Sequence, residues 1–197
     1  MQTPVGGLLK LMPVDLQIHS GNVAFLSMLL SEELKLSQRE TGKIMLGGLI
    51  HDIGKICIDD SIIYKKGKLT VSEFREIKKH CHYGEEILLR YAKLTYLLPI
   101  VKYHHERWDG KGYYGLKGEE IPLAARIICI ADCFDAMVSK RCYKDNLTLA
   151  GAKLELFNCS GSQFEPYLVD KFIQCLKKIN TGDLKSHYAF LLGEAIE

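Results

Sequence analysis

Histidine and aspartate side chains recur within segments of this chain that otherwise have the apolar character of buried helices. They lie in the run from His104 to Tyr114 and at His19, His51, Asp52, His80 and Asp132. Burying that many polar groups without partners would cost on the order of a few kcal/mol for each group. Metal ions satisfy imidazole and carboxylate groups together. The pattern therefore predicts a fold in which separate helices carry these residues to one buried metal site.

The expected secondary structure is helical almost throughout, because apolar residues recur at spacings of three and four and no sustained alternation indicates a strand. Capping boxes at Ser37 with Glu40 and at Thr70 with Glu73 mark two helix starts. The expected helices cover about 14–34, 37–56, 70–91, 97–105, 122–139, 148–157 and 166–179. We therefore expect an all-α fold, a helical bundle of about 7–8 helices with a metal site in its core.

The length of 197 residues fits a single domain over 1–197, with the motif-bearing core at about 15–179 and a tail or extra helix at 181–197. A net charge of +2 is too mild to indicate binding to a nucleic acid polymer. The longest apolar stretches, 44–50 and 123–138, are too short or too charged to predict a membrane segment.

The sequence opens without the pattern of a signal peptide. The 7 cysteines are odd in number and form no C-x-x-C pair, which favours reduced thiols over disulfides. Both observations predict a cytoplasmic protein.

The adjacent pair His51 and Asp52 is expected near the end of the helix over 37–56. A carboxylate has two oxygens and can bridge two ions, whereas an imidazole binds one. Lys55 follows one turn later, so its ammonium group is expected over the same face. Earlier in this helix, Gly47 and Gly48 lower helix propensity, which indicates a close contact with another helix.

An ordered set of motifs extends from about Asp15 to Ile173. It comprises His19-Ser20, His51-Asp52-Ile53-Gly54-Lys55, Lys68-Leu69-Thr70, His80 with Gly84, His104-His105-Glu106-Arg107-Trp108-Asp109-Gly110-Lys111-Gly112-Tyr113, Ile121-Pro122-Leu123-Ala124-Ala125-Arg126, Asp132 with Asp135, and Gly161-Ser162-Gln163-Phe164. In these motifs the chain resembles the HD-GYP family, a branch of the HD-domain metal-dependent phosphohydrolases that degrades cyclic di-GMP.

The resemblance implies two divalent metal ions, with Asp52 as the bridging ligand. The implied ligands are His19, His51, Asp52, His80, His104, His105 and Asp132. Asp15 stands where some members hold a third ion with glutamate, and it is the candidate ligand of such an ion. Ligands without thiolate suit iron or manganese, with zinc or nickel as substitutes.

The resemblance also implies residues that act on the substrate. Asp52 and Lys55 are the implied catalytic residues. The implied substrate contacts are Lys55, Tyr113, Asp135, Arg141 and Lys144. Behind the ligands, we expect Glu106 to orient a ligand histidine and Arg107 to pair with a carboxylate and hold the loop.

Three positions depart from the family pattern. Tyr114 replaces the proline of Gly-Tyr-Pro, so a residue that fixes φ is lost after Tyr113. Cys142 replaces a proline between Arg141 and Tyr143. Glu165 replaces an aspartate before Pro166 and is a poor N-cap, which predicts a local loss of about 1 kcal/mol.

The favoured hypothesis is a phosphodiesterase that uses a metal-bridging hydroxide to hydrolyse cyclic di-GMP to pGpG, and onward to GMP. The alternatives are an HD-type phosphohydrolase of cyclic GMP-AMP or a nucleoside phosphate, and an inactive cyclic di-GMP-binding signalling module. The partner predictions are a regulatory protein or diguanylate cyclase at the 109–118 loop, and a second copy of the chain in a homodimer.

Overall fold

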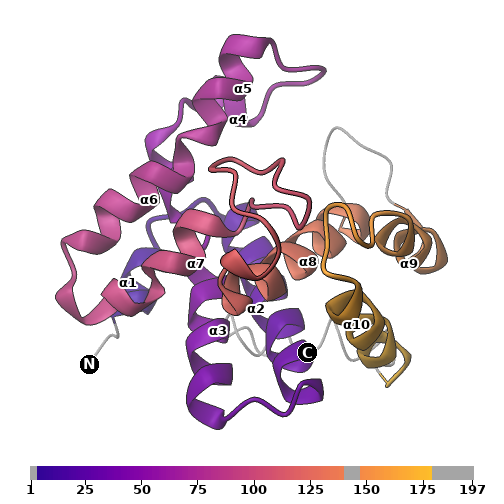
Figure 1. The fold of residues 1–197 in the computed structure, drawn as a ribbon. Helices are drawn as coiled ribbons and strands as arrows, with labels where there is room; N and C mark the ends of the chain where they lie inside the picture. Colours follow the sequence, from indigo (N-terminus) through magenta and orange to yellow (C-terminus); the bar gives the residue numbers. More distant parts are fainter. Residues whose placement is uncertain (1–3, 140–146, 179–197) are drawn as a thin grey trace, which may run out of the picture.

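The computed structural model describes residues 4–139 and 147–178, and its architecture is set by two long central helices, α2 (Val14–Glu33) and α8 (Leu123–Val138). These helices pack against each other, and α2 also packs along α3 (Gln38–Ile50). In Figure 1 these helices form the middle of the molecule, with α5 at one end and α9 and α10 at another. The prediction of an all-α fold is confirmed.

The other elements surround this centre. They are α1 (Pro4–Leu9), α4 (Asp60–Ile63), α5 (Val71–Lys78), α6 (His80–Leu89), α7 (Leu98–Tyr103), α9 (Leu149–Asn158), α10 (Pro166–Lys178) and the 3-10 segments η1 (Ile53–Cys57), η2 (Ala92–Leu97) and η3 (Gly118–Glu120). Within the described ranges, no helix has both the length and the apolar character needed to cross a bilayer.

Close packing of α3 against its neighbours depends on two glycines. A Cβ atom at Gly48 would lie 2.7 Å from the Cα of Ala24 in α2, and a Cβ at Gly47 would collide with the side chain of Ile100 in α7. The predicted close helix contact at these glycines is confirmed. Both predicted capping boxes, at Ser37 and at Thr70, are also present.

Two predicted helices are shorter than expected. The helix expected over 37–56 ends at Ile50, and the chain turns at Asp52 into η1. A Cβ at Gly54 would collide with the backbone of α6, so this turn allows η1 to lie directly against that helix. The helix expected over 70–91 divides at Lys79 into α5 and α6. Both breaks lie beside a candidate metal ligand.

The apolar core continues into the C-terminal part of the fold, where α9 and α10 pack on α8. The ring of Phe134 in α8 meets the ring of Phe172 in α10 edge-on, with 5.3 Å between centroids. At the start of α10, the carboxylate of Glu165 accepts from Arg126 Nη1 of α8 at 2.5 Å. Glu165 directly precedes α10, so its ion pair with Arg126 joins the start of α10 to α8.

Candidate metal centre

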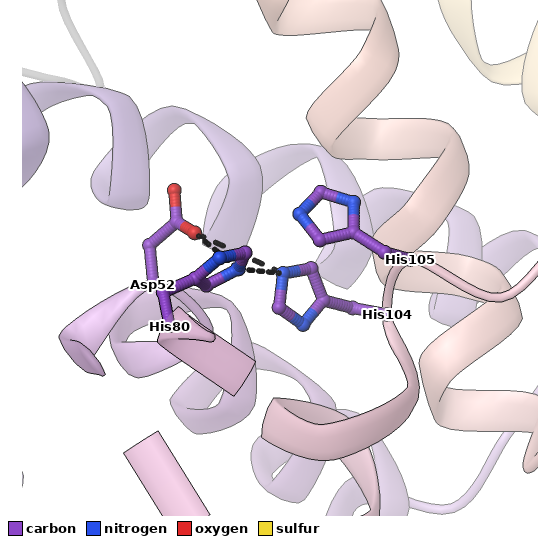
Figure 2. A group of neighbouring side chains, drawn as sticks. All are labelled: Asp52, His80, His104 and His105. Carbon is purple, nitrogen blue, oxygen red and sulfur yellow. Dashed lines mark hydrogen bonds and ion pairs between the residues drawn. The ribbon is translucent and has the colours of Figure 1, made fainter. Parts of the chain in front are cut away.

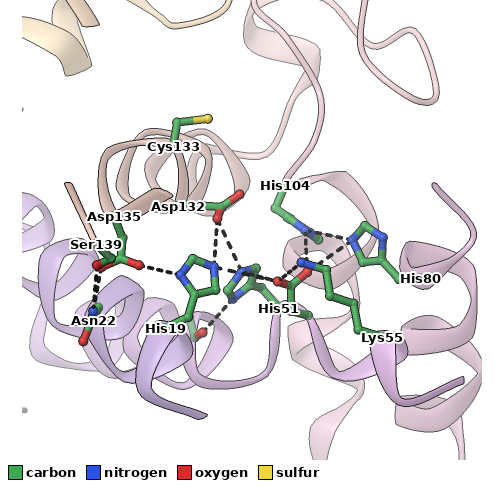
Figure 3. A network of polar contacts seen from close by, with 12 residues as sticks. His19, Asn22, His51, Lys55, His80, His104, Asp132, Cys133, Asp135 and Ser139 are labelled. Carbon is green, nitrogen blue, oxygen red and sulfur yellow. Dashed lines mark hydrogen bonds and ion pairs between the residues drawn. The ribbon is translucent and has the colours of Figure 1, made fainter. Parts of the chain in front are cut away.

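The seven predicted ligands come together from five parts of the chain. Figure 3 shows several of them facing one another, with His19 and Asp132 on one side of His51 and with His80 and His104 on the other. His19 comes from α2, the pair His51 and Asp52 from the α3–η1 turn, and His80 from the first residue of α6. The others are His104 and His105, after α7, and Asp132 in α8.

Asp52 lies at the middle of this arrangement, and its two carboxylate oxygens face different histidines. Oδ1 lies 3.4 Å from Nε2 of His80 and 3.8 Å from Nε2 of His104. Oδ2 lies 3.4 Å from Nε2 of His51 and 3.8 Å from Nε2 of His19. The Asp52 side chain is only 1% exposed, so neither oxygen is turned to solvent.

The potential ligand atoms fall into two groups, each with all its atoms within 4.8 Å of one another, and Asp52 belongs to both. The first group is Asp52, His80, His104 and His105, drawn in Figure 2. The second is His19, His51 and Asp52. Asp132 adjoins the second group, because its Oδ1 lies 3.0 Å from His19 Nε2 and 4.0 Å from His51 Nε2. The two groups of potential ligands therefore share one carboxylate, that of Asp52.

Backbone carbonyl groups fix the orientation of three of the imidazole rings. The Nδ1 atoms of His51, His80 and His104 lie 2.8, 2.6 and 3.0 Å from the carbonyl oxygens of the residues three positions earlier. A carbonyl oxygen only accepts, so each Nδ1 carries the proton and donates. In the neutral ring, Nε2 then has a free lone pair directed at the centre, as a metal ligand requires.

The ring of His19 is held by a carboxylate instead. Its Nδ1 lies 2.6 Å from Oδ2 of Asp135 in α8. Oδ1 of Asp135 accepts from Asn22 Nδ2 and from Ser139 Oγ, each at 2.6 Å. Asp135, predicted to contact substrate, is buried, and it also lines the cavity beside the centre. Its hydrogen bond holds the His19 ring in place.

The protonation states suit cation binding at most of these groups. Burial lowers the pKa of His80 to about 4 and holds the pKa of His105 well below its usual value, so both rings are neutral. Burial alone would raise the pKa of Asp52, but Lys55 and His51 hold it well below its usual range. For His19, burial opposes protonation, yet hydrogen bonds with Asp132 and Asp135 raise its pKa to about 9.

Two buried atoms at the centre test whether a cation fits there. Within residues 4–139 and 147–178, Nε2 of His51 and Oδ1 of Asp52 are buried side-chain atoms without a hydrogen-bond partner. Leaving a buried polar atom unpaired costs about 1–3 kcal/mol. A divalent cation in each group of ligands would satisfy these atoms, one beside Oδ1 of Asp52 and the other beside Nε2 of His51. The donor set of nitrogen and oxygen atoms fits iron, manganese or zinc.

Lys55 and Tyr113, two of the predicted substrate contacts, lie at the edge of the centre. The Lys55 ammonium donates to Oδ2 of Asp52 at 2.5 Å, and the Lys55 side chain is 20% exposed. The Tyr113 ring packs on His105, with 4.7 Å between ring centroids, and the Lys78 ammonium lies 4.8 Å from the Tyr113 centroid. Arg141 and Lys144, the other predicted substrate contacts, lie outside the described residues.

The loop after His105 is held by the two residues expected behind the ligands. Glu106 is buried, and its two carboxylate oxygens accept from the backbone N–H groups of Tyr114 at 2.6 Å and Leu116 at 2.7 Å. It therefore fixes the loop rather than orienting a histidine. Arg107 pairs with Asp109 at 2.9 Å, as expected. A proline at position 114 would have no N–H for Glu106 to bind.

A cavity of about 560 Å³ opens beside His19 and Lys55. Its size lies within the usual range for small-molecule sites. Asp15, the candidate ligand of a third ion, lines this cavity, and its Oδ1 accepts from the hydroxyl of Tyr64 at 3.0 Å. Among the described residues, neither group of clustered ligand atoms includes Asp15.

Sequence reasoning gave no role to three residues that complete the site: Asn22, Ser139 and Tyr64. The helical spacing offered a signal for the first two. Asn22 follows His19 by three residues, and Ser139 follows Asp135 by four, so each shares a helix face with its partner. Tyr64 offered none, because its contact with Asp15 joins residues far apart in the chain.

Comparison with known proteins agrees with this geometry. The profile of the HD domain family matches residues 8–168. The chain is 42% identical over 164 residues to a cyclic di-GMP phosphodiesterase of Thermotoga maritima, covering 82% of this chain and 45% of that protein. It is 40% identical over 159 residues to the 3'3'-cGAMP-specific phosphodiesterase 2 of Vibrio cholerae, covering 79% of this chain and 30% of the relative.

The fold also resembles a solved structure, an HDG"Y"P protein from Bdellovibrio bacteriovorus. The two share 20% sequence identity with a TM-score of 0.67, and the match covers 82% of this chain and 52% of that one. At this identity the similarity concerns the fold. The chain spans less than half the length of the two curated relatives, at 45% and 30%.

Proposed function

The chain belongs to the HD-domain family, in the HD-GYP branch whose motifs it carries, and on this premise we propose that it is a metal-dependent phosphodiesterase acting on cyclic di-GMP. The observation that carries the proposal is the position of Asp52, with one carboxylate oxygen toward His80 and His104 and the other toward His19 and His51. A shared carboxylate between two histidine groups suits two ions that act on one phosphate.

In this proposal, His80, His104 and His105 hold one ion, and His19, His51 and Asp132 hold the other. Asp52 contributes to both. Iron or manganese are the expected metals. Two such ions polarise a phosphoryl oxygen and lower the pKa of water, which supplies the nucleophile at neutral pH.

The protein's own residues supply orientation and charge. Asp135 holds the His19 ring, and carbonyl groups hold the rings of His51, His80 and His104, so the ligand atoms are fixed before substrate binds. Lys55 lies at the rim of the cavity. Its ammonium can donate to a phosphoryl oxygen as negative charge grows there in the transition state.

The substrate assignment follows the relatives. Named cyclic di-GMP phosphodiesterases and a cGAMP-specific enzyme match the same region at 42% and 40% identity, so a 3',3'-linked cyclic dinucleotide is the supported substrate class. We propose cyclic di-GMP as the substrate and pGpG as the first product. Cyclic GMP-AMP is the second candidate because of the Vibrio relative.

The 109–118 loop is the proposed contact for a regulatory partner. Glu106 holds this loop by accepting hydrogen bonds from the backbone of Tyr114 and Leu116. Tyr114 itself is 44% exposed. The ring of Tyr114 packs edge-on against Tyr103, with 5.6 Å between centroids, and presents an aromatic surface next to the centre.

The proposal is tested by purifying the protein without chelators, measuring bound metal and incubating it anaerobically with cyclic di-GMP and Mn²⁺ or Fe²⁺. We expect two ions per chain and pGpG as the first product. Asp52→Asn, which preserves shape, should abolish both, whereas Asp60→Asn, at an exposed acid of α4, should change neither. Two tightly held ions without turnover of any cyclic dinucleotide would instead support the binding module.

A further inference from the structure

The loop over 159–164, between α9 and α10, is closed on itself by backbone hydrogen bonds. The N–H group of Gly161 donates to the carbonyl oxygen of Phe164 at 2.9 Å, and that of Gln163 donates to the carbonyl oxygen of Cys159, also at 2.9 Å. Gly161 has a φ of 77°, in the left-handed region that glycine adopts without strain. These contacts fix the shape of a motif to which the proposed function gives no role.

The loop over 159–164 binds the backbone that follows the metal ligand His105. The N–H group of Trp108 donates to the carbonyl oxygen of Gln163 at 3.1 Å. The N–H group of Asp109 donates to the carbonyl oxygen of Ser162 at 2.8 Å. Two adjacent backbone hydrogen bonds hold both the position and the direction of the chain after His105.

The side-chain amide of Gln163 joins this segment to α8. Its Oε1 accepts from Nη1 of Arg107 at 3.2 Å, and its Nε2 donates to Sγ of Cys133 at 3.1 Å. Arg107 follows His105 by two residues, and Cys133 directly follows the ligand Asp132. Because α8 packs against both α2 and α9, it is the fixed side of this link.

His105 is the ligand that most needs such support. Within residues 4–139 and 147–178, its imidazole has no hydrogen bond, whereas Nδ1 of each of the other four histidine ligands has a partner. The His105 ring packs on the rings of His104 and Tyr113, with 4.1 and 4.7 Å between centroids. Ring packing directs a lone pair less strictly than a hydrogen bond does, so the placement of His105 depends on its backbone.

We propose that Gln163 is a positioning residue, which holds His105 in place to bind the ion it shares with Asp52, His80 and His104. The inference rests on the proposed two-metal function and names the residue that supports one of its ligands. If Gln163 served only the fold, its loss would lower stability and leave metal binding unchanged. A positioning role instead predicts that one ion is affected more than the other.

The test is to measure the affinity for each Mn²⁺ ion by competition with a chromophoric chelator. Gln163→Met keeps the length of the side chain but removes the amide. It should weaken one ion by about 3- to 10-fold, less than the 10- to 100-fold typical when a group bonded directly to a ligand is lost. The other ion should change by less than about twofold. His105→Ala, which removes the ligand, identifies the ion that should be affected.

Two further variants separate positioning from folding. Gln163→Glu should restore the affinity to within about threefold, because its carboxylate accepts from Arg107 and the Cys133 thiol can donate to it. Gln174→Met is the control, because the Gln174 amide donates to Asp170 within α10, and it should change neither ion. The absorption spectrum of the Co²⁺-loaded protein, which reports coordination geometry, should change in Gln163→Met and return in Gln163→Glu.

Unchanged affinities and an unchanged spectrum in Gln163→Met, with a lower melting temperature, would show that the loop serves the fold alone and would overturn the inference. An equal loss at both ions, or no recovery in Gln163→Glu, would overturn it as well. A wild type that holds two ions but hydrolyses no cyclic dinucleotide would contradict the proposed function alone, because the affinities test Gln163 without turnover.

Discussion

Replacing Asp135 with asparagine separates two roles that its position allows, holding a metal ligand and contacting substrate. Oδ2 of Asp135 accepts from His19 Nδ1, and Oδ1 accepts from Asn22 and Ser139. An asparagine keeps the shape and can still accept from His19 through its carbonyl oxygen. Its amide group would donate to Asn22 once that side chain turns, because Oδ1 of Asn22 is buried without a partner among the described residues.

The variant is therefore expected to fold, and its main effect is the loss of negative charge behind His19. A hydrogen bond to a neutral acceptor is about half as strong as one to a carboxylate. Removing the partner of a ligand histidine typically lowers metal affinity by about 10- to 100-fold, or about 1.4–2.8 kcal/mol. We expect a loss of this size for Asp135→Asn.

The assay is competition for Mn²⁺ or Zn²⁺ between the protein and a chromophoric chelator. Ser139→Ala is the matched control, because it removes one hydrogen bond to the same carboxylate but keeps its charge, and it should change metal affinity by less than about threefold. Melting temperature verifies folding of both variants. Unchanged metal affinity in Asp135→Asn, together with a raised KM for cyclic di-GMP, would refute the positioning role.

Three further predictions concern stability and are read from thermal or denaturant unfolding. Tyr114→Pro should destabilise the protein by about 1–3 kcal/mol relative to Tyr114→Ala, because proline removes the N–H that donates to Glu106; equal stabilities would contradict this. Gly48→Ala should cost about 1–3 kcal/mol through collision with Ala24, whereas Gly42→Ala, with open space around it, should be neutral or stabilising. Thr70→Ala should cost about 1 kcal/mol by removing the α5 cap, and a change below about 0.3 kcal/mol would show that the cap is not needed.

Features that depend on neighbouring residues were predicted well from the sequence. The capping boxes at Ser37 and Thr70 join residues three apart, and the long helices α2 and α8 follow from their apolar spacing. The end of α3 at Ile50 could not be predicted from the spacing of apolar residues, because apolar residues continue through η1. The chain turns there because Gly54 lies against the backbone of α6, a contact that only the folded chain contains.

The resemblance implied seven metal ligands, and the fold brings their side chains together, but it did not indicate which residues hold them in place. Asp135 lies 116 residues from His19 in sequence, and only the packing of α8 on α2 brings the two together. Glu106 binds the backbone of its own loop, which becomes apparent only when the loop is closed. Local patterns identify residues able to bind a metal, whereas the groups that orient them are selected by tertiary contacts.

The central claim is that Asp52 bridges two metal ions, and anomalous diffraction from crystals of the manganese-loaded protein tests it most directly. We predict two anomalous peaks about 3.5–4 Å apart. One peak should contact Oδ1 of Asp52 together with His80 and His104, and the other should contact Oδ2 together with His19 and His51. A single peak, or two peaks of which only one contacts Asp52, would show that Asp52 does not bridge two ions.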